Sequence, residues 1–306
     1  MERLTQTDPK ISTVVLIGNF DGVHAGHQAL IRQAKRISQK HHWRVVALTF
    51  DPHPSVVLRP HPPKKYLITP LDLKIYWMEY YGVDYVSVLS FNHELAMVPP
   101  MAFLTLEVRQ KLRAEAVVVG YNFTFGAGGT GSIETLKNWG ELTGVKVRIV
   151  EPINTESLVV SSSAIRQYII EGHISEANNL LAHPFSVQGV AQKGAGRGSQ
   201  IGIPTLNCLP PSQQIMPPFG VYAGYLSLNG SETRWPGVAN WGIRPTFQGE
   251  EAAIQQHVID RDLGDLHDQS MRFDFYHSLR PEKKFDRIEA LVSQIRQDID
   301  QARKLL

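Results

Sequence analysis

The sequence has little of what marks secreted or membrane proteins. Its 306 residues include one cysteine, Cys208, so no internal disulfide can form and no Cys-rich metal site exists. The longest apolar runs, such as residues 116–119, are far too short to span a bilayer. Residues 1–10 are polar and lack the apolar segment of a secretory signal. We therefore expect a reduced, cytoplasmic protein without a membrane partner.

The sequence also lacks a large excess of charge of either sign. It has 31 Lys and Arg residues against 29 Asp and Glu, a net charge of +2. A nucleic-acid partner would need Lys and Arg clustered on one face, so we expect none, whereas small polyanions such as nucleotides remain compatible. With 42% hydrophobic and 20% charged residues, the composition is that of a globular protein, and the length suffices for two domains.

Strand-like and helix-like segments alternate in the first half of the chain. Strands are predicted over residues 14–17, 44–50, 85–89, 115–119 and 145–150, and helices over 26–40, 72–81 and 100–112. This alternation predicts the α/β class, with a doubly wound parallel sheet that has helices on both faces. Ligands bind such sheets beyond the carboxyl ends of the strands. The Pro-rich stretch 52–63 is predicted to be a long loop.

The second half has shorter strands separated by Gly and Pro. The candidates are residues 186–192, 221–228, 235–240, 254–260 and 271–276. This spacing predicts an antiparallel β-barrel. The apolar residues Ile288, Leu291, Val292 and Ile295 fit one terminal amphipathic helix that packs on the barrel. We expect the two domains to cover residues 1–182 and 183–306.

The strongest local pattern lies between the first strand and the first helix. It comprises Gly18, Asn19, Phe20, Asp21, Gly22, His24, Gly26 and His27. Glycines let a backbone approach phosphates closely, and a helix N-terminus attracts anions. His24 and His27 are three residues apart, so in a first helical turn they share one face. There they can donate hydrogen bonds to a triphosphate and to the charge that develops as pyrophosphate leaves.

A second anion-binding pattern follows the fifth strand. Three consecutive hydroxyls, at Ser161, Ser162 and Ser163, precede Arg166 at a predicted helix start. A serine at a helix start is usually only an N-cap. This pattern gains weight because we expect it at the same end of the sheet as the glycine-rich loop.

In their order and combination, these motifs resemble those of the bacterial bifunctional riboflavin kinase/FMN adenylyltransferase family, the prokaryotic FAD synthetases. The resemblance rests on residues 18–27, 50–54, 119–126 and 161–166, with Ser163 where the family has Thr. It implies that the first domain is a nucleotidyltransferase that transfers AMP from ATP to FMN and makes FAD. It also implies that His24, His27, Ser162, Ser163 and Arg166 act on the phosphates and that Asn122 lies on the flavin side.

The resemblance continues through the barrel and implies a riboflavin kinase there. It rests on residues 196–207 and 237–247, followed by Lys284 and Phe285. By this resemblance, Gly202, Pro204, Asn240 and Arg244 help to bind the substrates. Thr205 and Asn207 hold the magnesium of Mg-ATP, and their hydroxyl and amide oxygens are the hard ligands that Mg²⁺ requires. The substrates and products implied are riboflavin, FMN, FAD and ATP.

The barrel departs from the family pattern at two positions. Ser199 replaces the second Arg of the family's Arg-Gly-Arg, and Gln255 stands where the family has the Glu that acts as the catalytic base. A neutral amide does not usefully accept a proton near pH 7. Glu250, Glu251 or a water could substitute as the base.

Three functions therefore stay open. The first is the bifunctional enzyme. The second is an FMN adenylyltransferase whose barrel is impaired by Gln255 and Ser199. The third is a non-enzymatic flavin- or nucleotide-binding protein, which the retention of both His24 and His27 disfavours.

Overall fold

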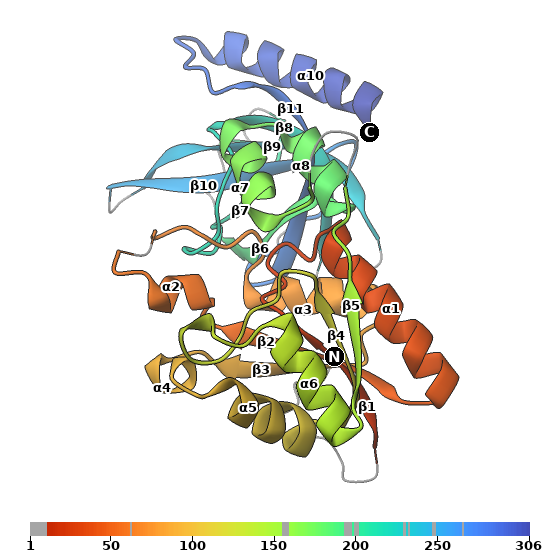
Figure 1. Ribbon diagram of the computed structural model, residues 1–306. Helices are drawn as coiled ribbons and strands as arrows, with labels where there is room; N and C mark the ends of the chain where they lie inside the picture. The colour runs from red at the N-terminus through yellow and green to blue at the C-terminus, as the bar shows by residue number, and fades with distance from the viewer. Residues whose placement is uncertain are drawn as a thin grey trace. The chain divides into compact units, whose positions relative to one another are not determined.

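The chain folds into two compact units. The computed structural model of the protein describes residues 11–61, 63–154, 159–192, 198, 202–228, 231, 233–246, 249–264 and 266–306. The first unit runs from residue 1 to 162 and the second from 163 to 306. Each unit is built around its own β-structure (Figure 1). The domain boundary predicted after residue 182 stays a prediction, because compactness alone groups residues 163–182 with the barrel.

The first unit contains the predicted parallel sheet. Its strands are β1 (Thr13–Ile17), β2 (Arg44–Asp51), β3 (Tyr85–Ser90), β4 (Ala114–Gly120) and β5 (Lys146–Val150). They lie in the order β3-β2-β1-β4-β5, and every neighbouring pair is parallel. All five carboxyl ends therefore meet at one edge. The prediction of a doubly wound parallel sheet is confirmed.

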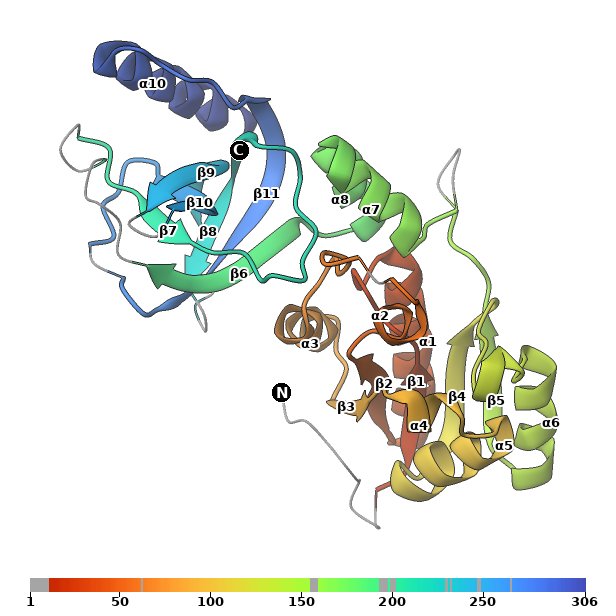
Figure 2. The same ribbon diagram turned by 90° about the vertical axis from the view of Figure 1, so that its left-hand side faces the viewer.

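Helices cover both faces of this sheet, because successive side chains of the central strand point to opposite sides. On β1, Val14 and Leu16 pack in one core cluster, and Val15 and Ile17 pack in another. The first cluster lies against α1 (Ala25–His41) and α3 (Leu71–Tyr80). The second lies against α5 (Pro100–Phe103), the π-helix η1 (Leu104–Lys111) and α6 (Ile133–Thr143). These layers are seen from the side in Figure 2.

Several elements of this unit differ from the sequence predictions. The stretch 52–63, predicted as a loop, contains the short helix α2 (Pro54–Leu58), which begins with proline at its first turn. The helix predicted over 100–112 is a single α-helical turn that continues as a π-helix. The helix α6 was not predicted. Shorter pieces are α4 (His93–Ala96) and the 3₁₀ turn η2 (Ala127–Gly129).

The second unit is the predicted antiparallel barrel. It begins with α7 (Ser162–Glu171) and α8 (Ile174–Leu181). The strands are β6 (Phe185–Gln192), β7 (Leu206–Cys208), β8 (Gly220–Leu228), β9 (Trp235–Thr246), β10 (Gly249–Val258) and β11 (Ser270–Pro281). They close in the order β10-β7-β6-β11-β8-β9, which confirms the barrel. The short strand β7 was not predicted.

The terminal helix α10 (Ile288–Leu305) packs on the outside of the barrel, as predicted (Figure 1). Its contact residues differ from those expected. Ala302, Ile299 and Leu306 meet the barrel residues Val221 and Ala223, whereas Ile288 is 64% exposed. Asp298 is buried and accepts hydrogen bonds from the guanidinium of Arg280 on β11, at 3.0 and 2.8 Å. Among the described residues, no helix is long and apolar enough to cross a membrane.

Candidate functional site

The glycine-rich loop lies where the sequence predicted it, between the carboxyl end of β1 and the N-terminus of α1. Residues 18–24 form the connection, and His24 is the N-cap of α1. The backbone turns sharply here, with φ of 51° at Phe20, 88° at Gly22 and 38° at Val23. Positive φ is unfavourable for residues that have a side chain, and such strain is concentrated at functional sites. Phe20 and Val23 are fully buried and anchor the loop in the core below.

The two histidines of the loop form a stacked pair. Their ring centroids are 3.7 Å apart with an interplanar angle of 20°, and the ring of Phe20 meets His27 edge-on at 5.2 Å. The glycine at position 26 leaves room for this stack, because a Cβ atom there would lie 3.1 Å from the His24 ring and would displace it. The predicted shared face of His24 and His27 is confirmed.

The electrostatics of the site favour a neutral imidazole at His27. Burial lowers the pKa of His27 well below its ordinary value, and His24 and Lys74 lower it further. The Nδ1 atom of His27 is buried and has no hydrogen-bond partner among the described residues. Unpaired buried polar atoms are uncommon and call for an explanation such as a functional role. At neutral pH, His27 therefore acts as a neutral hydrogen-bonding group.

Asp21 holds the loop to the connection that precedes α3. Its carboxylate accepts hydrogen bonds from the amides of Ile68, at 2.9 Å, and Thr69, at 3.0 Å. The amide of Gly22 donates to the Thr69 hydroxyl at 2.9 Å. We predicted that Asp21 binds the nucleotide, and these bonds give it an anchoring role in the structure.

The serine motif at residues 161–166 begins beside this loop. The hydroxyl of Ser162 donates to the backbone carbonyl of Asp21 at 2.8 Å, across 141 residues of sequence. This bond brings Ser162 to the loop, as the sequence predicted. Ser163 and Arg166 belong to the second compact unit, and their phosphate contacts stay a prediction.

A buried lysine near the loop escaped the sequence analysis. Lys74 lies on α3, and its ammonium donates a hydrogen bond to the Thr49 hydroxyl at 3.4 Å. Thr49 in turn donates to the carbonyl of Asn19 at 3.2 Å. The available signal was a lysine flanked by Leu73 and Ile75 in a helix with many apolar residues, a position where a lysine is rarely buried without a reason.

Asn122 follows β4 at the same carboxyl edge of the sheet. Its side chain is exposed, and its Oδ1 atom lies 3.6 Å from the point where a Cβ of Gly120 would be. Phe123 and Phe125, which follow it in the chain, stack with ring centroids 5.2 Å apart. Since β4 is the neighbour of β1, Asn122 and Gly18 both stand at the ends of adjacent strands.

In the barrel, three predicted site residues stand in one row across adjacent strands. Gln255 on β10 is paired with Asn207 on β7 and with Asn240 on β9. Directly paired residues point to the same face of a sheet. The register therefore brings the position of the missing base beside a predicted magnesium ligand.

The residues present fit a magnesium ion. The Oδ1 atom of Asn207 is buried and has no hydrogen-bond partner among the described residues, as expected for an acceptor that faces a cation. Within the described part of the chain, no group of three or more His, Cys, Asp or Glu side chains could hold a metal. A magnesium ion at Asn207 would therefore depend on neutral oxygens and on phosphate ligands.

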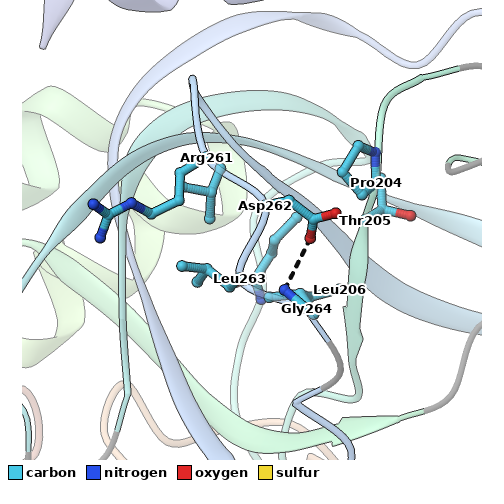
Figure 3. Close-up of a pocket in the computed structure, with 9 residues that line it drawn as sticks. Pro204, Thr205, Leu206, Arg261, Asp262, Leu263 and Gly264 are labelled. Atoms are coloured by element: carbon cyan, nitrogen blue, oxygen red, sulfur yellow. Dashed lines mark hydrogen bonds between the residues drawn. The ribbon is translucent and has the colours of Figure 1, made fainter.

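A cavity of about 250 Å³ is lined by the next pair of this register, Leu206 and Gln256 (Figure 3). Its lining includes Pro204, Thr205, Gln256 and Gly264. The Nδ1 atom of His257 lies 2.9 Å from the carbonyl of Pro204. Two of the predicted binding residues, Pro204 and Thr205, thus border a space that can hold part of a nucleotide.

Of the other residues predicted to matter in the barrel, some lie within the described part of the chain and some outside it. Gly202 is described, with a positive φ of 75°. Ser199 and the side chains of Arg244, Glu250 and Glu251 lie outside the described residues. Burial raises the pKa of Cys208 to about 12, so this thiol is a core residue, as expected, rather than a nucleophile.

Comparison with known proteins gives consistent family matches for both units. A family profile described as FAD synthetase matches residues 6–164, and one described as riboflavin kinase matches residues 181–306. A curated protein of Listeria monocytogenes, a bifunctional riboflavin kinase/FMN adenylyltransferase, is 36% identical and covers 94% of this chain and 90% of its own length. The Bacillus subtilis protein of the same name is 34% identical, with coverage of 96% and 93%.

A solved structure matches over almost the whole chain. It is a crystal structure described as a macrolide-efflux protein from Streptococcus pneumoniae. The TM-score is 0.85 at 29% sequence identity, and the match covers 98% of this chain and 96% of the other. The fold of both units therefore has an experimental counterpart.

Proposed function

The chain belongs to the bifunctional riboflavin kinase/FMN adenylyltransferase family and is an enzyme of FAD biosynthesis, and we propose that each half carries one reaction. The barrel converts riboflavin and ATP to FMN and ADP. The first unit converts FMN and ATP to FAD and pyrophosphate. The partners in this proposal are all small molecules.

The stacked pair His24–His27 at the N-terminus of α1 is the observation that carries the AMP-transfer assignment. An oxygen of the FMN phosphate attacks the α-phosphorus of ATP, and the bond from that phosphorus to the bridging oxygen breaks. The incoming phosphate is already an anion, so no nucleophilic side chain is needed. The two imidazoles and the helix N-terminus stabilise the charge that collects on pyrophosphate.

The other residues of this site have positioning roles in the proposal. Gly18 and Gly22 let the backbone approach the phosphates. Ser162, already bonded to the loop, Ser163 and Arg166 bind phosphate oxygens. Asn122 at the end of β4 orients the flavin.

In the barrel, the riboflavin 5′-hydroxyl attacks the γ-phosphorus of ATP, and ADP leaves. Thr205 and Asn207 would hold Mg²⁺, which would neutralise charge on the phosphates. The Gln255 amide oxygen can accept a hydrogen bond from the hydroxyl and orient it, but the amide does not take the proton, which passes to water instead. A positioned base is typically worth roughly 10²- to 10⁴-fold in rate. Phosphoryl transfer depends mainly on positioning and electrostatics, so activity survives at a reduced rate.

One observation favours a second candidate, an adenylyltransferase with a silent barrel. Gln255 stands beside Asn207, where the family has its base, and no carboxylate occupies that position in the row. In this case the barrel would bind flavin without phosphorylating it.

A single substitution tests the site assignment. His27→Ala is expected to abolish FAD formation from FMN and to leave riboflavin phosphorylation unchanged, since the two reactions are assigned to different units. Both products are measured by chromatography on the same sample, so the kinase rate also serves as the control for folding. FAD formation at the wild-type rate would show that the loop is not the adenylyl-transfer site.

A further inference from the structure

Lys74 is a charged residue in a place that disfavours charge. Its side chain is on α3, the residue is 3% exposed, and its helix neighbours Leu73 and Ile75 belong to the core cluster beneath α1. Transferring an ammonium from water into such a site costs free energy unless it is paired. A residue kept at such a cost has a compensating partner or a function.

Its hydrogen bonds lead to the loop of the proposed adenylyl-transfer site. The ammonium donates to the Thr49 hydroxyl at 3.4 Å, and Thr49 donates to the Asn19 carbonyl at 3.2 Å. Thr49 is itself fully buried on β2, the neighbour of the central strand β1. A two-bond relay thus connects the lysine to the backbone of the residue that follows Gly18.

The charges around Lys74 give it a second role. Asp21 in the loop and Asp51 at the end of β2 both attract the ammonium and raise the pKa of Lys74, although burial lowers it overall. The Asp21 carboxylate in the loop has the same sign as a polyphosphate. A site that receives a triphosphate needs positive potential to offset that carboxylate.

We propose that Lys74 is a positioning residue for adenylyl transfer: a buried cation that fixes the phosphate loop through Thr49 and offsets Asp21 and Asp51 beneath it. This inference rests on the function proposed for the loop. The ligand class that benefits is the triphosphate of ATP, which meets a loop held in place and with part of the nearby negative charge offset.

The ammonium of Lys74 also affects the pKa of His27. The titratable neighbours that act on His27 are His24 and Lys74, and both lower its pKa. Lys74 therefore helps to keep His27 neutral. Removing the ammonium is expected to raise the pKa of His27, an effect that a merely space-filling lysine would not have.

The first test replaces Lys74 by an apolar residue of similar length. Lys74→Met is expected to lower the rate of FAD formation from FMN on the order of 100-fold, the size seen when one preorganised electrostatic group is removed. Riboflavin phosphorylation on the same sample should not change. The melting temperature should hold or rise, since a buried charge has been replaced by an apolar group. Lys35→Met is the matched control, because the Lys35 ammonium also donates at 3.4 Å, but to the backbone carbonyl of Tyr81.

A second readout separates positioning from stability. The His27 imidazole, followed by NMR as pH is varied, should titrate at higher pH in Lys74→Met than in the wild type. Thr49→Val, which cuts the relay and keeps the charge, should slow FAD formation about ten-fold, in line with a small misplacement of a catalytic group, without moving that titration. If Lys74→Met does not fold, the rate of Thr49→Val still shows whether Lys74 positions the loop through Thr49.

The outcomes are distinguishable from failure of the proposed function. A wild-type enzyme that makes no FAD from FMN would refute the function itself. A wild-type enzyme that is active, with unchanged rates in Lys74→Met and Thr49→Val and an unchanged His27 titration, would overturn the role of Lys74. A fall in melting temperature with an unchanged rate per folded molecule would show that the lysine only stabilises the fold.

Discussion

Gly26 separates the two histidines of the loop, and its missing side chain lets their rings meet. We predict that Gly26→Ala displaces His24, since the new Cβ would lie 3.1 Å from that ring. Displacements of about 1 Å near reacting groups cost up to 10²-fold in rate, so we expect a loss of roughly ten-fold in kcat/KM for FAD formation. Steady-state kinetics with FMN measures this. Ala25→Gly, next to it, is the control for helix propensity, and an equal loss there would refute the steric explanation.

A substitution at Gln255 is predicted to raise a reaction rate. We expect Gln255→Glu to raise riboflavin phosphorylation by at least about ten-fold, because a carboxylate in line with Asn207 can accept the proton of the hydroxyl. Initial rates of FMN formation measure the gain, and FAD formation from FMN should stay constant. An unchanged kinase rate would mean that another group already accepts the proton.

His27 also predicts a pH dependence of stability. Its folded pKa is lower than its unfolded value of 6.5, so below pH 6.5 the unfolded chain binds a proton that the folded state does not. Stability of the first unit should therefore fall as pH decreases from about 7 to 5.5, and His27→Gln should reduce that fall. Hydrogen exchange of the buried β1 amides measures it. The exposed His93, changed to Gln, is the control, and an identical slope in both variants would contradict the lowered pKa.

Among the elements, α10 depends on one ion pair. Arg280 donates to both carboxylate oxygens of the buried Asp298, and Gln294 donates to the same group at 3.0 Å. We predict that Arg280→Met destabilises the barrel unit by about 3 kcal/mol, because it leaves a buried carboxylate without its cation. Thermal unfolding measures the loss, and Arg296→Met, at an exposed site on α10, is the control. A loss below that of the control would show that the apolar contacts alone hold the helix.

The elements that the sequence predicted are those whose pattern is local. The run 14–17 was predicted as a strand because it is apolar and rich in β-branched residues, and the structure buries all of it. The apolar stripe of α1 at Leu30, Ile31 and Ala34 is likewise visible in the sequence. The helix α6 could have been found from its capping box, in which Ser132 and Thr135 exchange hydrogen bonds. The helix α10 was expected to pack through Ile288, but the barrel instead selects Ala302 and Ile299, a choice that depends on tertiary contacts.

In the site, too, some features follow from local sequence and others depend on tertiary contacts. The positions of His24, His27 and Ser162 followed from local motifs and from the rule that parallel strands end at one edge. Lys74 did not, because Thr49 is 25 residues away and nothing local indicates that the two meet. The pairing of Gln255 with Asn240 lies within the β9–β10 hairpin, but its pairing with Asn207 requires β7 to lie next to β10 across more than 40 residues of sequence.

At the scale of the whole molecule, most predicted site residues divide between the two compact units, with Ser163 and Arg166 of the serine motif in the second unit. The loop and the histidine pair belong to the first unit, and the Asn207–Gln255–Asn240 row belongs to the second. This separation makes either reaction an internal control for the other. The relatives that share the full length carry both names in one chain, as expected if the product of the barrel is the substrate of the sheet domain.

The most direct test of this account is a chromatographic assay of the purified protein with Mg-ATP, supplied with riboflavin in one reaction and with FMN in another. We predict FAD from both substrates, with FMN as an intermediate only in the first reaction. FAD from FMN alone would contradict an active barrel and identify Gln255 as the reason. No FAD from FMN would contradict the assignment of the histidine loop, on which the account rests.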